Sequence, residues 1–75
     1  MYAKAVQLTS VTTRDVLIFK KSFSAAKYLI DLGILDGVPN NYVSAINKAC
    51  KNEDVIFGYK CKYISLPYKE YFKLD

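Results

Sequence analysis

The chain contains no histidine and no tryptophan, and it has only three glycines, two prolines and two cysteines among 75 residues. Histidine performs most general acid–base chemistry near neutral pH, so its absence excludes the commonest catalytic arrangements. Gly33, Gly37 and Gly58 are isolated from one another, and no glycine-rich phosphate-binding loop is present. Two cysteines without histidine also cannot complete a typical zinc site. The sequence therefore predicts no enzyme, no metal, no cofactor and no small-molecule substrate.

The acidic residues and the thiols do not change this expectation. Glu53 and Asp54 are adjacent in a polar break, where solvated side chains are the usual outcome, and the other carboxylates are scattered. Cys50 and Cys61 lie among apolar residues, so we expect two buried thiols, with a disulfide between them as the less favoured alternative. A nucleophilic cysteine would lack a histidine base.

Long hydrophobic runs are also absent. No segment approaches the ~20 apolar residues that a membrane span requires, and residues 1–10 lack the apolar run of a signal peptide. We therefore expect a cytoplasmic protein without a membrane partner.

What the sequence does contain is positive charge and aromatic residues. Eleven lysines and arginines oppose seven acidic residues, which gives a net charge of +4, and there are seven tyrosines and four phenylalanines. An apolar content of 52% is enough for one small folded domain over residues 1–75. The charge favours a polyanionic partner, either nucleic acid or an acidic protein surface, although it can also serve solubility alone.

Hydrophobic periodicity predicts three strands. Residues 5–8 alternate apolar and polar side chains, and the apolar run 16–19 follows a polar break, which together indicate a hairpin. The break has no glycine, so a two-residue primed turn is not expected there. Residues 57–63 alternate most clearly and predict the third strand.

Two helices are expected between the second and third strands. Residues 25–30 are mostly good helix formers with one apolar stripe, capped by Ser22 or Ser24 and ended by Gly33. After a loop over 34–40, Asn40 or Asn41 would cap a second helix at roughly 41–51. The spacing of Tyr68, Tyr71 and Phe72 suits a short helical turn in the tail, residues 65–75.

These elements predict an α+β fold with the order β-β-α-α-β and a short C-terminal tail. In this fold a small three-stranded antiparallel sheet, made by the N-terminal hairpin and the C-terminal strand, packs on a helix-turn-helix pair.

The order of the motifs is similar to that of a known family. A hairpin over 6–19 precedes Ala25-Ala26-Lys27-Tyr28-Leu29, then Ile46-Asn47-Lys48-Ala49-Cys50, and finally Gly58-Tyr59-Lys60-Cys61-Lys62-Tyr63-Ile64. This order resembles the NUMOD1-like helix-turn-helix modules of phage- and intron-encoded homing endonucleases, here as a stand-alone module. The turn over 34–41 is longer than theirs, and Cys61 replaces a usual aromatic residue. The resemblance implies DNA binding without cleavage.

In a helix-turn-helix the second helix enters the major groove, with its N-terminal residues at the base edges. The candidate base readers are therefore Asn41, Tyr42, Ser44 and Asn47. The candidate phosphate contacts are Lys48 and Lys51, flanked by Lys20, Lys21 and Lys27, with Lys60 and Lys62 as a second basic stripe. Simpler interpretations are a capping role for Asn41 and ordinary solvated lysines at 60 and 62.

Two alternatives to a monomeric DNA-binding module remain. A phage-type module of this size can instead bind and inhibit a host protein, such as a defence nuclease, a polymerase subunit or a replication factor. The aromatic residues Tyr68, Tyr71 and Phe72 would then contact the partner. Alternatively, a homodimeric regulator would double the number of phosphate contacts.

Overall fold

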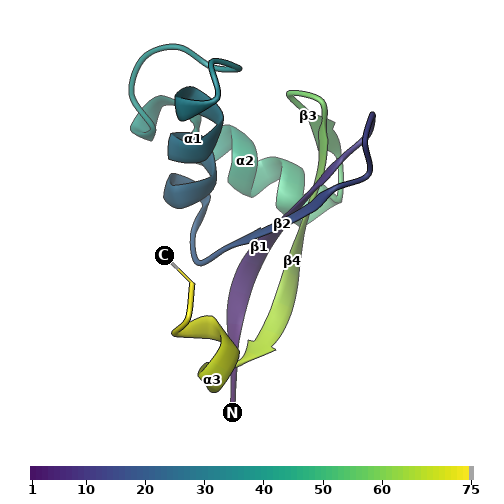
Figure 1. The fold of residues 1–75 in the computed structure, drawn as a ribbon, viewed down its shortest axis with the longest axis vertical. Coiled ribbons are helices and arrows are strands. Elements are labelled where there is room, and N and C mark those ends of the chain that lie inside the picture. The colour runs from purple at the N-terminus through teal and green to yellow at the C-terminus, as the bar shows by residue number, and fades with distance from the viewer. Residues whose placement is uncertain (75) are drawn as a thin grey trace.

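The computed structural model describes residues 1–74 as a four-stranded antiparallel sheet with three helices (Figure 1). The strand order in the sheet is β2-β1-β4-β3. The elements in chain order are β1 (Tyr2–Ser10), β2 (Val16–Phe19), α1 (Ser22–Asp31), α2 (Asn40–Asn52), β3 (Val55–Ile56), β4 (Tyr59–Pro67) and α3 (Tyr68–Tyr71). Asp75, the last residue of the predicted tail, lies outside the described residues.

The prediction of a three-stranded sheet in the order β-β-α-α-β is wrong, because the expected strand 57–63 is part of a hairpin. Ile56 pairs with Tyr59, so Phe57 and Gly58 form a two-residue turn between β3 and β4. Both have positive φ, 55° and 82°, as a type I′ turn requires. Phenylalanine is unusual at such a position, and a two-residue turn does not interrupt an alternating pattern. The alternating pattern therefore gives no sign that the chain reverses direction at Phe57 and Gly58.

The connection between β1 and β2 is a five-residue loop over 11–15, which confirms that no two-residue primed turn lies there. Ser10 organises this loop. Its hydroxyl oxygen accepts the backbone N–H groups of Thr12 at 3.3 Å and Thr13 at 3.2 Å. Its own N–H donates to the carbonyl of Asp15 at 2.9 Å. Arg14 has a φ of 66°, so the loop adopts the left-handed conformation without a glycine, and the Ser10 hydrogen bonds stabilise it.

Neither long helix has the predicted side-chain cap. Lys21 precedes α1 and Pro39 precedes α2, and neither side chain caps its helix. Ser22 is instead the first residue of α1, where it is buried. Pro39 has a φ of −56°, which is already helical, so α2 begins at Asn40 without help from an asparagine side chain.

The predicted end of α1 at glycine is confirmed. Gly33 has a φ of 78°. Its N–H donates to the carbonyl of Ile30 at 2.9 Å, and the N–H of Ile34 donates to that of Leu29 at 3.0 Å. This pair of bonds is a Schellman motif, which satisfies carbonyls that a helix end otherwise leaves without donors.

The hydrophobic core lies between the sheet and the two long helices, which cover the same side of the sheet (Figure 1). The buried residues come from the sheet, from α1, from the loop after it and from α2; they are Val6, Leu8, Ala25, Ala26, Leu29, Leu35, Ile46, Ala49, Cys50 and Cys61. None of the helices within residues 1–74 is long and apolar enough to span a membrane.

The middle of β1 is covered on both faces. Ala5 and Val6 are consecutive, so they point to opposite faces of the sheet, yet they are only 0% and 2% exposed. Helix α3 (Tyr68–Tyr71) contacts β1 and β4 at the end of the sheet where β1 begins (Figure 1).

Candidate nucleic-acid interface

The exposed face of α2 is polar and free of negative charge. Its buried residues Ile46, Ala49 and Cys50 share one side of the helix. No aspartate or glutamate occurs between Asn40 and Asn52. The exposed residues are Asn40, Asn41, Ser44, Asn47, Lys48, Lys51 and Asn52. This surface therefore offers amides, a hydroxyl and two ammonium groups without a carboxylate between them.

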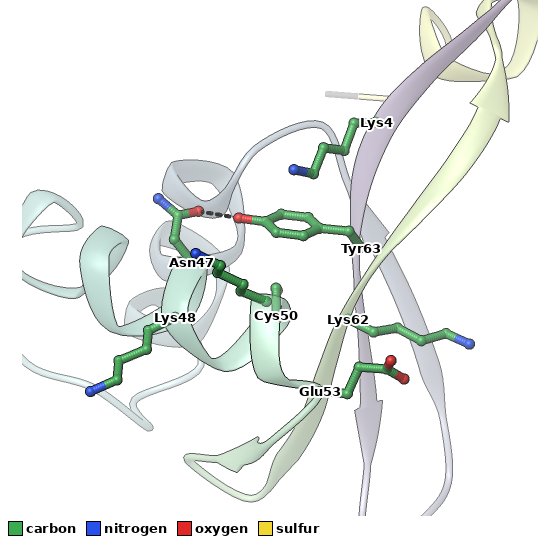
Figure 2. Close-up of a pocket in the computed structure, with 8 residues that line it drawn as sticks. Lys4, Asn47, Lys48, Cys50, Glu53, Lys62 and Tyr63 are labelled. Carbon is green, nitrogen blue, oxygen red and sulfur yellow. Dashed lines mark hydrogen bonds between the residues drawn. The ribbon is translucent and has the colours of Figure 1, made fainter.

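Asn47 joins three elements of the fold. Its side-chain oxygen Oδ1 accepts hydrogen bonds from the Ser22 hydroxyl of α1 and, at 2.9 Å, from the Tyr63 hydroxyl of β4 (Figure 2). Ser22 is only 5% exposed, and a hydroxyl buried to that degree requires a partner. The polar contact therefore fixes α1, α2 and β4 relative to one another, despite the long loop between the helices.

Lys4 lies over the ring of the same tyrosine. Its Nζ is 3.8 Å from the centroid of the Tyr63 ring, a cation–π contact. Val6 is paired directly with Tyr63, so Lys4, two residues earlier on β1, is its diagonal neighbour on the same face. Tyr63 thus holds an ammonium group over its ring and an amide at its hydroxyl.

An open groove of about 920 Å³ runs between α2 and the β1–β4 pair. We call it the lysine groove; it is lined by Lys4, Asn47, Lys48, Cys50, Lys51, Glu53, Lys62 and Tyr63. A smaller groove of about 310 Å³ shares Lys4, Asn47 and Tyr63 with it and adds Lys20 and Lys21. Within residues 1–74 the one ion pair joins Lys73 to Glu70, so these lysines have no carboxylate partner.

The structure brings most of the predicted residues to this region. Lys20, Lys21, Asn47, Lys48, Lys51 and Lys62 line the two grooves. Asn41 and Ser44 are exposed on the adjoining face of α2. Lys62 lies at the rim, and its side chain extends away from Asn47 (Figure 2).

Tyr42 is placed differently from the prediction. It is half-buried, its hydroxyl donates to the carbonyl of Asp36, and its ring meets Phe57 edge-on at 5.8 Å. These contacts stabilise the inter-helix loop and the β3–β4 turn, so Tyr42 is occupied as a structural residue. A tyrosine near a helix N-terminus gives no sequence signal that separates the two roles.

Two predicted lysines lie elsewhere. Lys27 is on α1 beside Asp31, in a hollow that also includes Phe19 and Tyr28. Lys60 lies with Thr9 on the opposite face of the sheet from the core, because strand residues alternate between faces. Lys62 has the same parity as Lys60 and reaches the lysine groove only at its rim, so the predicted basic stripe of Lys60 and Lys62 is present but points to the face of the sheet away from α2.

Sequence reasoning missed Lys4, and the missed signal was available. Lys4 has the same parity as Val6 and Leu8, so a strand extended to Tyr2 places it on the helix-bearing face. The role of Tyr63 was also missed, because its place in the alternating run 57–63 indicated only a strand residue.

The buried thiols do not supply a nucleophile. Cys50 and Cys61 are reduced and 2% and 1% exposed. Burial raises the pKa of Cys61 to about 12, and it also raises the pKa of Cys50. Loss of hydration likewise raises the pKa of Tyr63, which keeps its hydroxyl protonated as a donor to Asn47. Thiolate chemistry near neutral pH is therefore disfavoured at both cysteines.

No protein-family model, curated protein or solved structure matches this chain. The resemblance to homing-endonuclease modules therefore stays a prediction from the order of the motifs.

Proposed function

We propose that this chain is a non-catalytic module that binds duplex DNA through the exposed face of α2 and the adjoining lysine groove. The observation that carries this proposal is the thirteen-residue helix without a carboxylate, continuous with a groove whose lysines form no ion pair with any of residues 1–74. Such a surface attracts the phosphate backbone. Together with the motif order, this supports a phage-type regulatory module acting in a bacterial cytoplasm.

The division of labour on α2 follows from side-chain chemistry. Asn41 and Ser44 are exposed near the helix N-terminus, where their amide and hydroxyl groups suit base edges. Lys48 and Lys51 follow along the same face and suit phosphates, which position the protein without specifying sequence. Tyr42 is left out of this set because its hydroxyl is already bonded to Asp36.

A duplex fits this surface better than a single strand. Proteins that bind single strands present open aromatic faces on which bases stack. The aromatic residue in the lysine groove is Tyr63, and Lys4 covers its ring while Asn47 engages its hydroxyl. The groove therefore offers charge and N–H donors rather than a stacking platform.

The test is fluorescence anisotropy with labelled duplex DNA at several salt concentrations. Neutralising about four phosphates predicts a slope near −3.6 in a plot of log affinity against log salt. A protein that stays folded and binds no duplex at ~50 mM salt would contradict the proposal.

A second candidate is inhibition of a host protein, and one observation favours it. At the end of the sheet next to α3, Met1, Tyr2 and Phe72 are 92%, 69% and 68% exposed. Tyr68 and Tyr71 pack against Phe72 at ring distances of 5.7 Å. Exposed apolar residues of this size suit a protein partner or a second copy of the chain. Retention of one host protein from nuclease-treated lysate, lost in Phe72→Ser, would support this candidate, and light scattering would reveal a homodimer.

A further inference from the structure

We infer that a phosphate group binds between Lys4 Nζ and Asn47 Nδ2 at the mouth of the lysine groove. Strand β1, outside the two helices, would then contact the nucleic-acid backbone. The inference rests on the proposed function for its natural ligand, a backbone phosphate of duplex DNA. The binding position itself follows from the contacts of Lys4, Asn47 and Tyr63.

Asn47 supplies two directed donors. Its Oδ1 accepts two hydrogen bonds, from Ser22 and Tyr63, and both lone pairs are thereby used. The Nδ2 group makes no hydrogen bond to any residue within 1–74 and lies on the side of the amide away from the Tyr63 hydroxyl (Figure 2). The two bonds fix the amide plane, so these N–H groups are oriented before any ligand arrives.

Lys4 supplies a positive charge that is held in place. The Tyr63 ring positions its ammonium group, 3.8 Å from the ring centroid, and no carboxylate within residues 1–74 forms an ion pair with it. Tyr63 therefore contacts both groups, the ammonium through its ring and the amide through its hydroxyl. Ordering these groups in advance lowers the entropic cost of binding an anion. Lys48 and Lys51 line the same groove and add to the positive potential.

The shape of the groove favours a phosphate within a polymer. A volume of about 920 Å³ far exceeds one phosphate group, and the groove is open rather than enclosed. It continues into the smaller groove beside Lys20 and Lys21. A chain of phosphates can follow this path, whereas a small phosphorylated molecule would leave most of it empty. Charge-assisted hydrogen bonds from N–H groups to phosphate oxygens are the interaction that such a site provides.

The binding position is tested with inorganic phosphate and NMR. In a ¹H–¹⁵N spectrum we expect the side-chain NH₂ signals of Asn47 to shift saturably as phosphate is added. Lys4→Gln should abolish that shift, whereas Lys60→Gln should retain it. Lys60 is the matched control, because it is an exposed lysine on the neighbouring strand but on the opposite face of the sheet. Asn47 signals that do not move, or that move equally in Lys4→Gln, would overturn the inference.

Asn47→Asp provides a second variant that should still fold. It retains acceptors for Ser22 and Tyr63 but removes the two N–H donors, so the spectrum should keep its native dispersion. The remaining signals around Lys4 and Tyr63 should no longer respond to phosphate. A response equal to that of the unmodified protein would argue against a role for the Asn47 amide.

Duplex binding by the same variants tests this inference independently of the proposed function. Lys4→Gln should reduce the magnitude of the salt slope by about 0.9, as expected for one lost phosphate contact, and Lys60→Gln should leave it unchanged. Duplex binding with an unchanged slope in Lys4→Gln would overturn the inference alone. Phosphate-dependent shifts without duplex binding would overturn the proposed function alone. Displacement of phosphate by a polyglutamate peptide as effective as DNA would contradict the choice of a phosphate ligand.

Discussion

Helices α1 and α2 lie on the same side of the sheet, yet their exposed faces differ. In α1, four of ten residues are buried, and its outer side carries Lys27 beside Asp31, a pair of opposite charges. In α2, three of thirteen residues are buried, and no carboxylate balances Lys48 and Lys51. Helix α1 therefore serves mainly to pack the core, whereas α2 packs on one side and presents a cationic surface on the other.

Small residues explain why α1 is the packing helix. Ala25 and Ala26 are fully buried, and side chains of that size let the helix backbone lie close to its neighbours. The hydroxyl of Ser22 extends this buried side to Asn47 on α2. Thus α1 fixes the position of α2, and the outer face of α2 is left available for a ligand. This division suggests experiments that remove either the surface charge of α2 or its support from α1.

The largest effect is expected from reversing charge on α2. Lys48→Glu with Lys51→Glu should weaken duplex binding roughly 10²- to 10³-fold, since each reversal removes about 1 kcal/mol of attraction and adds a similar repulsion. Fluorescence anisotropy at constant salt measures the change. The matched control is Lys27→Glu with Lys60→Glu, which alters the net charge equally but on other surfaces. An equal loss in the control would mean that net charge, rather than α2, determines binding.

The next effect in size is expected at the contact between the helices. Asn47→Ala leaves the buried Ser22 hydroxyl without its acceptor, and an unsatisfied buried group costs about 1–3 kcal/mol. For a domain of this size each kcal/mol lowers the thermal midpoint by about 4–8 °C. Circular dichroism melting measures this shift. Asn47→Asp retains the acceptor and should melt close to the unmodified protein; a drop as large as that of Asn47→Ala would show that the hydrogen bond is not the stabilising feature.

The fold was predictable where periodicity and turn chemistry agree. The N-terminal hairpin, α1 with its glycine end and most of α2 all follow from local pattern. Strand β3 was not predictable, because Phe57 occupies a left-handed position of the turn after it, where asparagine or glycine usually indicates a hairpin. The serine and asparagine caps failed for a different reason. A nearby polar side chain can always cap a helix in principle, and only tertiary contacts show that Ser22 has another partner.

The candidate site was predictable in part. Lysines on α2 could be assigned to one face from helical spacing alone. The face of β1 that carries Lys4 could also be assigned, from its parity with Val6 and Leu8. Its contact with Tyr63 could not, since it depends on the register that places β1 beside β4 and Tyr63 diagonally across from Lys4. Tyr42 is the opposite case. Its position near the start of a helix favoured a contact with DNA bases, but its hydroxyl and ring are already engaged by Asp36 and Phe57.

The C-termini of α1 and α2 can be compared directly, because both helices end with the same pair of backbone hydrogen bonds. Glu53 N–H donates to the carbonyl of Cys50 and Asp54 N–H to that of Ala49, which repeats the pattern at Gly33 and Ile34. Gly33 closes α1 at a φ of 78°, but Glu53 closes α2 at a φ of 55°, where a side chain is strained. Glu53 also places a negative charge at the unfavourable end of the helix dipole and in the lysine groove.

Replacing these residues should therefore have opposite effects. Gly33→Ala should destabilise the protein by about 1 kcal/mol, and because nothing lies within 4 Å of the added methyl group, the cost is backbone strain alone. Glu53→Gly should stabilise it by about 0.5–1 kcal/mol and also tighten duplex binding by several-fold, since the groove loses its one carboxylate. Urea unfolding and anisotropy measure the two effects. Glu53→Gln separates them: it removes the charge but keeps the strain, so it should tighten binding with less gain in stability. If Glu53→Gly and Glu53→Gln leave DNA affinity unchanged, the lysine groove does not contact the duplex, and binding is confined to the outer face of α2.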